Sequence, residues 1–127
     1  MKVKIYYHHT DCGGVVYYAN YLHFLEEART EFLAVRGVNI KELIAQGAFF
    51  VVSHQELDYK APAAYGDILD ITTQVKEVSG VRINLEHKIK KTDGILVAQA
   101  KTTLAFVNRD FRPKPIPKEM RERIEKA

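Results

Sequence analysis

The spacing of apolar residues changes from a period of two to a helical period near the start of the chain. Residues 2–7 alternate between apolar and more polar side chains, which is the periodicity of a strand. Residues 15–36 instead carry an apolar stripe at helical spacing. The stripe consists of Tyr21, Leu25, Ala28, Phe32 and Val35. We therefore predict a short first strand, a tight loop at Gly13 and Gly14, and one long helix.

Four further segments have the composition of strands. Gly37 is a natural end for the long helix, and Asn39 can cap a second, short helix that ends near Gly47. Valine, isoleucine, threonine and aromatic residues then dominate residues 49–60, 67–78, 81–91 and 95–108. Turn sequences, Ser79-Gly80 and Asp93-Gly94, separate the last three of these segments, which predicts two consecutive hairpins. In the third segment one face is apolar and the other polar, which favours an antiparallel sheet.

The prolines near the end of the chain exclude another central strand. In RDFRPKPIP they lack the N–H that a strand ladder requires, and Pro117 then begins a short charged helix, PKEMRERIEK. A helix with an apolar stripe needs the apolar face of a sheet to cover it. We therefore predict one α+β domain over residues 1–127, with the long helix lying across a curved, five-stranded antiparallel sheet.

Composition and charge are those of an ordinary globular domain. Hydrophobic residues make up 46% of the chain and charged residues 28%, and no segment approaches the roughly 20 apolar residues that span a bilayer. The net charge of +3 is too small for a general nucleic-acid binder. No signal peptide is evident, and the lone Cys12 cannot form an internal disulfide. We expect a cytoplasmic protein with no integral membrane segment and no nucleic-acid partner.

The segment TDCGGVVYYANYLHFLEEAR, residues 10–29, resembles the signature of the 4-hydroxybenzoyl-CoA thioesterase family of hot dog folds. More narrowly, it resembles the acyl-CoA thioesterases associated with the Tol-Pal system. The matching positions are Thr10, Asp11, Gly14, Val15, Val16, Tyr17, Asn20, Tyr21, Glu26, Ala28 and Arg29, followed more weakly by Tyr59, Pro62 and Ala63. The chain departs from the family pattern at His9, where an acid is common, and at Tyr18, where a histidine is frequent.

The resemblance implies a fold, an activity and an assembly. The fold is the hot dog, a five-stranded antiparallel sheet wrapped around a long central helix. The activity is hydrolysis of an acyl-CoA or acyl-carrier thioester, with Asp11 as nucleophile or general base and the Tyr18 backbone N–H as oxyanion donor. Coenzyme A is part of the substrate, so no separate cofactor is expected. A homodimer or homotetramer with the site between subunits is also implied, and an acyl carrier protein is a candidate partner.

Elementary chemistry provides an independent reason to consider Asp11. Thioester hydrolysis needs a group that attacks the carbonyl or deprotonates water, and donors for the oxygen that becomes negative. Asp11 precedes the predicted helix in a loop whose glycines let a carbonyl approach the backbone. The free N–H groups of the helix start carry the positive end of its dipole. The alternative is that Asp11 is only the N-cap of this helix.

Three neighbouring side chains offer rival chemistry. A thiol near a helix N-terminus can attack thioesters, but Cys12 occupies a position that the family leaves variable, and we interpret it as a small loop residue. Consecutive histidines on an extended chain point to opposite faces, so His8 and His9 are not expected to bind a metal. His9 is a candidate to orient Asp11 or a water molecule, and a solvent-facing histidine is the alternative.

Substrate-binding candidates lie in the loop, at the helix start and among the basic residues. Gly14, Tyr17 and Asn20 are expected to line the acyl pocket or its mouth. The phosphates of coenzyme A require basic groups, and the pool comprises Lys60, Arg82, Lys88, Lys90, Lys91, Arg109, Arg112 and Lys114. From this pool we single out Lys60, Lys88 and Lys90. Glu26 and Glu27 are interpreted as structural, with Glu26 paired to Arg29 along the helix.

Two other functions stay open at this level. The same fold supports hydration or dehydration of an acyl thioester, which needs a paired acid and base acting on the acyl chain, usually with a histidine. A non-enzymatic module that binds acyl-CoA or a partner, with the basic tail RDFRPKPIP as a candidate binding segment, is the other alternative.

Overall fold

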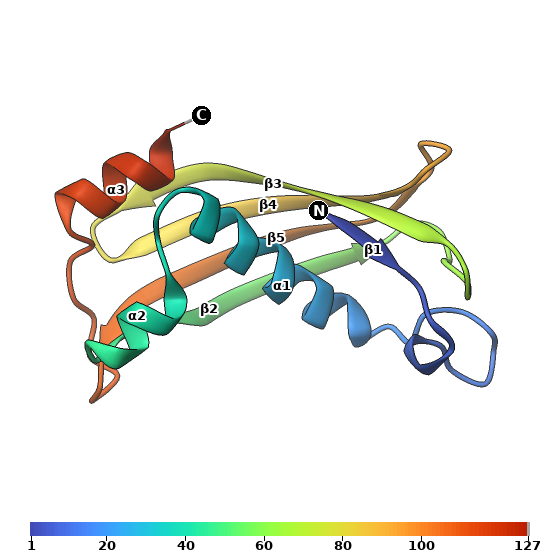
Figure 1. The fold of residues 1–127 in the computed structure, drawn as a ribbon, viewed down its shortest axis with the longest axis horizontal. Coiled ribbons are helices and arrows are strands. Elements are labelled where there is room, and N and C mark those ends of the chain that lie inside the picture. The colour runs from blue at the N-terminus through green and yellow to red at the C-terminus, as the bar shows by residue number, and fades with distance from the viewer. Residues whose placement is uncertain (127) are drawn as a thin grey trace.

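A single antiparallel sheet, in the strand order β1-β3-β4-β5-β2, forms one layer of the molecule (Figure 1). The computed structural model describes residues 1–126. The strands are β1 (Lys2–Lys4), β2 (Ala48–Tyr59), β3 (Ile68–Ser79), β4 (Arg82–Lys91) and β5 (Leu96–Asn108). The helices are α1 (Asn20–Val35), α2 (Ile40–Ala45) and α3 (Lys118–Glu125), with a 3-10 turn at Tyr7–His9. The predicted α+β fold, a long helix across a five-stranded antiparallel sheet, is confirmed.

Helix α1 lies across one face of the sheet and buries most of its predicted stripe (Figure 1). Tyr21, Leu25 and Ala28 are buried, whereas Val35 is 82% exposed. Val35 instead lines an open groove between α1 and β3, together with Phe32 and with Ile71, Thr72 and Thr73 of β3.

The long helix begins at Asn20, so the predicted start at residue 15 is wrong. Val15 forms an isolated antiparallel bridge with Ala64, and Val16 forms one with Thr10. The Val16 N–H also donates to the Ala63 carbonyl at 2.8 Å. Two β-branched residues here adopt the extended backbone they prefer because distant carbonyls and N–H groups satisfy them. The predicted Asn39 cap is confirmed, since its Oδ1 accepts from the Glu42 N–H at 3.1 Å.

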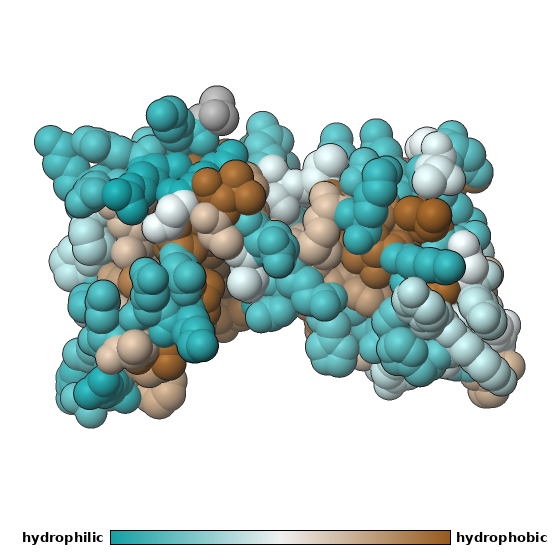
Figure 2. All heavy atoms as spheres, viewed as in Figure 1, coloured by the Kyte–Doolittle hydropathy of each residue, from teal (hydrophilic) through white to brown (hydrophobic). Residues whose placement is uncertain are grey.

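The core beneath α1 consists of two apolar clusters separated by polar side chains. Along β4, Ile89 belongs to the first cluster and Leu85 to the second. His87 lies between them on the same face, and on β5 the buried Thr102 lies between Ala100 of the first cluster and Leu104 of the second. The first cluster lies near the loop that precedes α1, and the second near α2 and α3. On the α1 side of the surface, hydrophobic residues likewise show in two groups with hydrophilic residues between them (Figure 2).

His87 is buried without a hydrogen-bond partner, next to a cationic side chain. Its ring is 1% exposed, and neither ring nitrogen has a partner among residues 1–126. Burial, and then the nearby Arg29 guanidinium, lower the pKa of His87 to about 4. Burial also lowers the pKa of Arg29. The expected ion pair between Glu26 and Arg29 does not form in the described residues; Glu26 instead accepts from the Thr30 hydroxyl at 3.4 Å.

The buried His87 predicts a pH-dependent stability. Its folded pKa of about 4 lies below the ordinary value of 6.5, so the unfolded chain binds more protons between these values. The free energy of unfolding should therefore fall as the pH drops from about 6.5 to 4, by on the order of 3 kcal/mol from this group.

Urea unfolding of the wild type, His87→Leu and His87→Gln across this pH range measures the effect. Neither replacement titrates, so both variants should lose this part of the pH dependence, while the carboxylates contribute equally to all three proteins. Parallel curves for all three proteins would contradict the assignment.

Candidate active site

Asp11 lies at the tip of a tight loop that the Thr10–Val16 bridge closes. The Asp11 N–H donates to the Val15 carbonyl and the Gly14 N–H to the Asp11 carbonyl, both at 3.0 Å. Gly14 has a φ of 81°, a conformation that favours glycine. The loop thus holds its shape through its own backbone and projects beyond the end of the sheet (Figure 1).

The Asp11 carboxylate is exposed and oriented by one neighbour. Its Oδ1 accepts from the Gly13 N–H at 2.8 Å, and a Cβ added at Gly13 would stand 3.1 Å from that oxygen. A Cβ at Gly14 would meet no atom within 4 Å, so the space beside the loop is open. Because the N-cap of α1 is Ala19, the interpretation of Asp11 as the cap of this helix is wrong. Cys12 is exposed beside it.

His9 closes the turn that leads into the loop. Its Nδ1 accepts from the Tyr6 N–H at 2.9 Å, which assigns the proton of the neutral ring to Nε2. The ring packs edge-on against Phe24, with the centroids 5.2 Å apart. Burial and then the neighbouring His8 lower the pKa of His9 below its ordinary value. Within residues 1–126, the ring makes no hydrogen bond to Asp11.

The expectation that His8 and His9 point to opposite faces is wrong. Both belong to the 3-10 turn rather than to an extended segment, and their ring centroids are 4.0 Å apart. Within the part of the chain that the structure describes, no group of three His, Cys, Asp or Glu side chains is arranged to hold a metal ion.

The His9 carbonyl joins the loop to the start of α1. It accepts from the Tyr17 N–H at 2.9 Å and from the Asn20 Nδ2 at 2.8 Å. The side chain of Asn20, which we expected near the acyl pocket, is therefore occupied by the backbone. Tyr17 is 44% exposed. A hydrogen bond with the Tyr18 side chain is the main cause that raises the pKa of Tyr17.

The two backbone N–H groups directly before α1 have no acceptor within residues 1–126. The Asn20 N–H donates to the Tyr17 carbonyl at 2.9 Å and the Leu22 N–H to the Ala19 carbonyl at 3.1 Å. The N–H groups of Tyr18 and Ala19 donate to nothing within residues 1–126. They stand at the positive end of the helix dipole, where an anion is stabilised.

The register of the sheet places the basic residues considered for phosphate binding at two opposite ends of the sheet. Lys60 follows β2, and Lys90 pairs with Leu96, so both lie at the end of the sheet near the loop. Arg82 begins β4 at the opposite end, about 30 Å away for a strand of this length. That far end also holds Arg109, Arg112 and Lys114, next to the end of β5. These four residues therefore lie far from Asp11 of the same chain.

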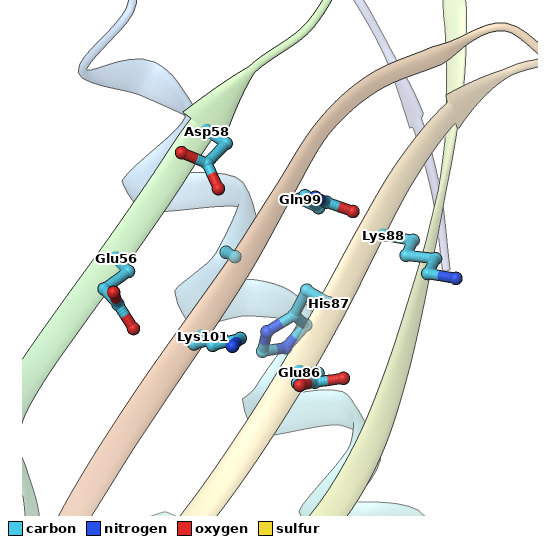
Figure 3. A pocket seen from close by; sticks show the side chains of 8 residues that line it. Glu56, Asp58, Glu86, His87, Lys88, Gln99 and Lys101 are labelled. Atoms are coloured by element: carbon cyan, nitrogen blue, oxygen red, sulfur yellow. The ribbon is translucent and has the colours of Figure 1, made fainter.

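Lys88 is on the sheet face that α1 does not cover. It lines a hollow of about 150 Å³ together with Glu56, Asp58, Glu86, Gln99 and Lys101 (Figure 3). Acidic and basic side chains alternate across the strands there, which is typical of a solvated sheet face. Lys91 is already paired with Asp67, at 3.5 Å from its Oδ2. Lys60 and Lys90 are thus the members of the pool at the loop end of the sheet that form no ion pair within residues 1–126.

Tyr59 was not among the site residues predicted from the sequence. Its hydroxyl donates to the Tyr18 carbonyl at 3.0 Å, directly beside the free N–H groups. The signal was present, since Tyr59 opens the Tyr-x-x-Pro-Ala motif that the resemblance includes. A motif alone does not show which backbone group its hydroxyl reaches.

No helix in the described part of the chain is long and apolar enough to span a membrane.

The chain matches known proteins over nearly its whole length. A model of the thioesterase-like superfamily matches residues 6–124. The acyl-CoA thioesterase YbgC of Haemophilus influenzae is 37% identical over 121 residues, covering 94% of this chain and 88% of that protein. The acyl-CoA thioester hydrolase YbgC of Escherichia coli O6:H1 is 34% identical over 117 residues, covering 91% and 87%.

Solved structures agree with this match. A probable thioesterase from Bartonella henselae superposes with a TM-score of 0.86 at 34% identity, covering 92% of this chain and 97% of that one. The resemblance found in residues 10–29 is thereby confirmed. The chain belongs to the thioesterase-like superfamily, with the hot dog fold and as an enzyme of the class that hydrolyses thioesters.

Proposed function

We propose that this protein hydrolyses the thioester of an acyl-CoA to a free acid and coenzyme A, and that Asp11 carries the reaction. One arrangement supports this assignment above all. The exposed Asp11 carboxylate is oriented by the Gly13 N–H, and the His9 carbonyl, which accepts from the Tyr17 N–H and the Asn20 side chain, joins its loop to the segment that carries the free N–H groups of Tyr18 and Ala19. Relatives named acyl-CoA thioesterases support the substrate class.

The carboxylate can act by either of two routes. As a nucleophile, Asp11 attacks the thioester carbon and the C–S bond breaks with loss of the coenzyme A thiolate; water then hydrolyses the resulting anhydride, which releases the acid, regenerates the carboxylate and leaves a proton for the thiolate. As a general base, Asp11 takes a proton from water while the hydroxide attacks the same carbon; the C–S bond then breaks, and the proton passes from Asp11 to the departing thiolate. Either route places negative charge on the carbonyl oxygen. The Tyr18 N–H is the proposed donor to that oxygen, because it is free and lies at the start of α1.

Substrate roles follow from where each candidate lies. Gly14 leaves the approach to the loop open, and the exposed Tyr17 ring is placed to border the acyl group. Asn20 and His9 are proposed to act by holding the loop. The Asn20 side-chain amide donates to the His9 carbonyl, and the His9 Nδ1 accepts from the Tyr6 N–H. Because His9 Nδ1 is already an acceptor, it is poorly placed as the base that a hydratase requires.

The anionic end of coenzyme A calls for the basic residues that remain. Lys60 and Lys90 lie at the loop end of the sheet. Lys88 lies two residues before Lys90 on β4, farther from the loop. All three are exposed. We propose Lys60 and Lys90 as the first contacts of the phosphates, with Lys88 as a secondary one. A phosphopantetheine on an acyl carrier protein would present the same arm, so that protein stays a candidate partner.

We further propose that two copies pair through β2. This strand is twelve residues long and, among the described residues 1–126, pairs only with β5, which leaves its other edge without a ladder. Val52 on this strand is 45% exposed. Long open edges with apolar residues are seldom left unpaired in native proteins. A homodimer is the expected unit, with a homotetramer as the larger alternative.

We also propose a cytoplasmic location, because the exposed thiol of Cys12 suits a reducing compartment.

The first test is the replacement Asp11→Asn, followed by release of free thiol from acyl-CoA esters of increasing length and from a benzoyl ester. Asparagine keeps an oxygen acceptor for the Gly13 N–H, so the loop should hold its shape while the ionised carboxylate is lost. The expected fall in kcat is roughly 10²- to 10⁴-fold.

The matched control is Cys12→Ala, which removes the rival nucleophile from the same exposed loop. It should retain the wild-type kcat. Wild-type activity in Asp11→Asn, or a comparable loss in Cys12→Ala, would refute the role of the carboxylate.

The assembly is tested with Val52→Lys, which places like charges along the proposed β2 edge. Light scattering at micromolar concentration should give a dimer or tetramer for the wild type and a shift toward the monomer for the variant, because the paired lysines repel one another. The variant Val35→Lys adds the same charge in the groove beside β3 and should leave the assembly unchanged. A monomeric wild type would exclude the proposed interface.

A further inference from the structure

The hydroxyl of Tyr59 connects the end of β2 to the start of α1. It donates to the Tyr18 carbonyl at 3.0 Å. The ring is held on two sides, with its centroid 5.7 Å from that of Tyr21 and in an edge-on arrangement with Tyr18 at 6.3 Å. A residue that is 50% exposed is therefore fixed in position by aromatic contacts and one hydrogen bond.

The Tyr18 carbonyl would ordinarily accept from a helix N–H. Here the Leu22 N–H turns instead to the Ala19 carbonyl, at 3.1 Å, which leaves the Tyr18 oxygen to the tyrosine hydroxyl. The C=O and N–H of a trans peptide point in opposite directions. Fixing the carbonyl of Tyr18 therefore fixes the direction of the Ala19 N–H, which belongs to the same peptide unit.

The preceding peptide unit is held in the same way by a different partner. The Tyr17 carbonyl accepts from the Asn20 N–H at 2.9 Å, and the Tyr18 N–H of that unit is free. Two consecutive peptide units thus have their carbonyls engaged and their N–H groups unoccupied. Successive free N–H groups of this kind form a small anion-binding concavity.

We propose that Tyr59 is a positioning residue that holds the Tyr18–Ala19 peptide, so that the Ala19 N–H serves as a second oxyanion donor beside that of Tyr18. This inference rests on the proposed thioester hydrolysis. A donor that is already aligned before the reaction needs no reorganisation when the carbonyl oxygen becomes negative. Tyr59 therefore contributes to the transition state rather than to binding of the acyl group.

The chemistry of Tyr59 suits a permanent donor. A carbonyl oxygen accepts only from a protonated hydroxyl, and burial together with Tyr18 raises the pKa of Tyr59 above its ordinary value. The hydroxyl consequently stays protonated throughout the pH range in which thioester hydrolysis is measured. The hydrogen bond is thus maintained under the conditions of any practical assay.

The test replaces Tyr59 by phenylalanine, which keeps the ring and removes only the hydroxyl. We expect kcat to fall about 10-fold, a fraction of the effect of deleting a donor outright, with KM changing by less than about twofold. The control is Tyr65→Phe. Tyr65 is exposed at the same end of the molecule, its ring stacks on Tyr7 at a centroid distance of 6.0 Å, and its hydroxyl has no hydrogen-bond partner within residues 1–126. The control should retain the wild-type kcat and KM.

A second measurement does not depend on turnover. In the amide spectrum of the ¹⁵N-labelled protein, the Ala19 signal should shift or broaden in Tyr59→Phe and stay in place in Tyr65→Phe. A wild type that hydrolyses no thioester would refute the proposed function while leaving this readout to judge the peptide geometry. If the wild type is active, any of three results for Tyr59→Phe would overturn the role of Tyr59. These are a kcat within twofold of the wild type, a change in KM alone, or an unchanged Ala19 signal.

Discussion

The carbonyl of His9 is the contact on which the geometry of the candidate site depends. It accepts from the Tyr17 N–H and from the Asn20 side chain, so the segment leading to Asp11 and the start of α1 share one oxygen. Because this acceptor is a backbone group, it does not depend on which side chain stands at that position. The departure from the family pattern at His9 therefore leaves the junction intact, and the imidazole adds a second tie through the Tyr6 N–H.

A second constraint is the way the sheet and α1 share their buried surface. The apolar residues beneath α1 do not form one continuous core, because His87 and Thr102 interrupt them on the two central strands. The Thr102 hydroxyl donates to Gln55 Oε1 at 2.8 Å, whereas His87 has no partner in the described chain. A buried polar group without a partner costs free energy of folding. That cost falls in the middle of the molecule rather than at the loop.

Local periodicity was enough to predict the hairpins, the helical stripe and the antiparallel sheet, because each depends on neighbouring residues along the chain. The start of α1 was not predictable in this way, since Val15 becomes extended through a bridge to Ala64, far along the sequence. The residue types of the loop indicated its chemistry. The use of the Asn20 amide and the acceptor of the Tyr59 hydroxyl both depend on tertiary contacts, which spacing does not encode.

The division of the core has a consequence for how such a protein can change. The cluster that includes Leu33, Phe106 and Ile124 lies under α2 and α3, at the end of the sheet without candidate chemistry. It lies at the end of the sheet opposite the Asp11 loop. The other cluster, with Val16, Tyr21 and Phe24, directly supports that loop. Substitutions that reshape the acyl site can therefore accumulate at one end while the opposite end preserves the fold, so specificity and robustness are free to evolve at different rates.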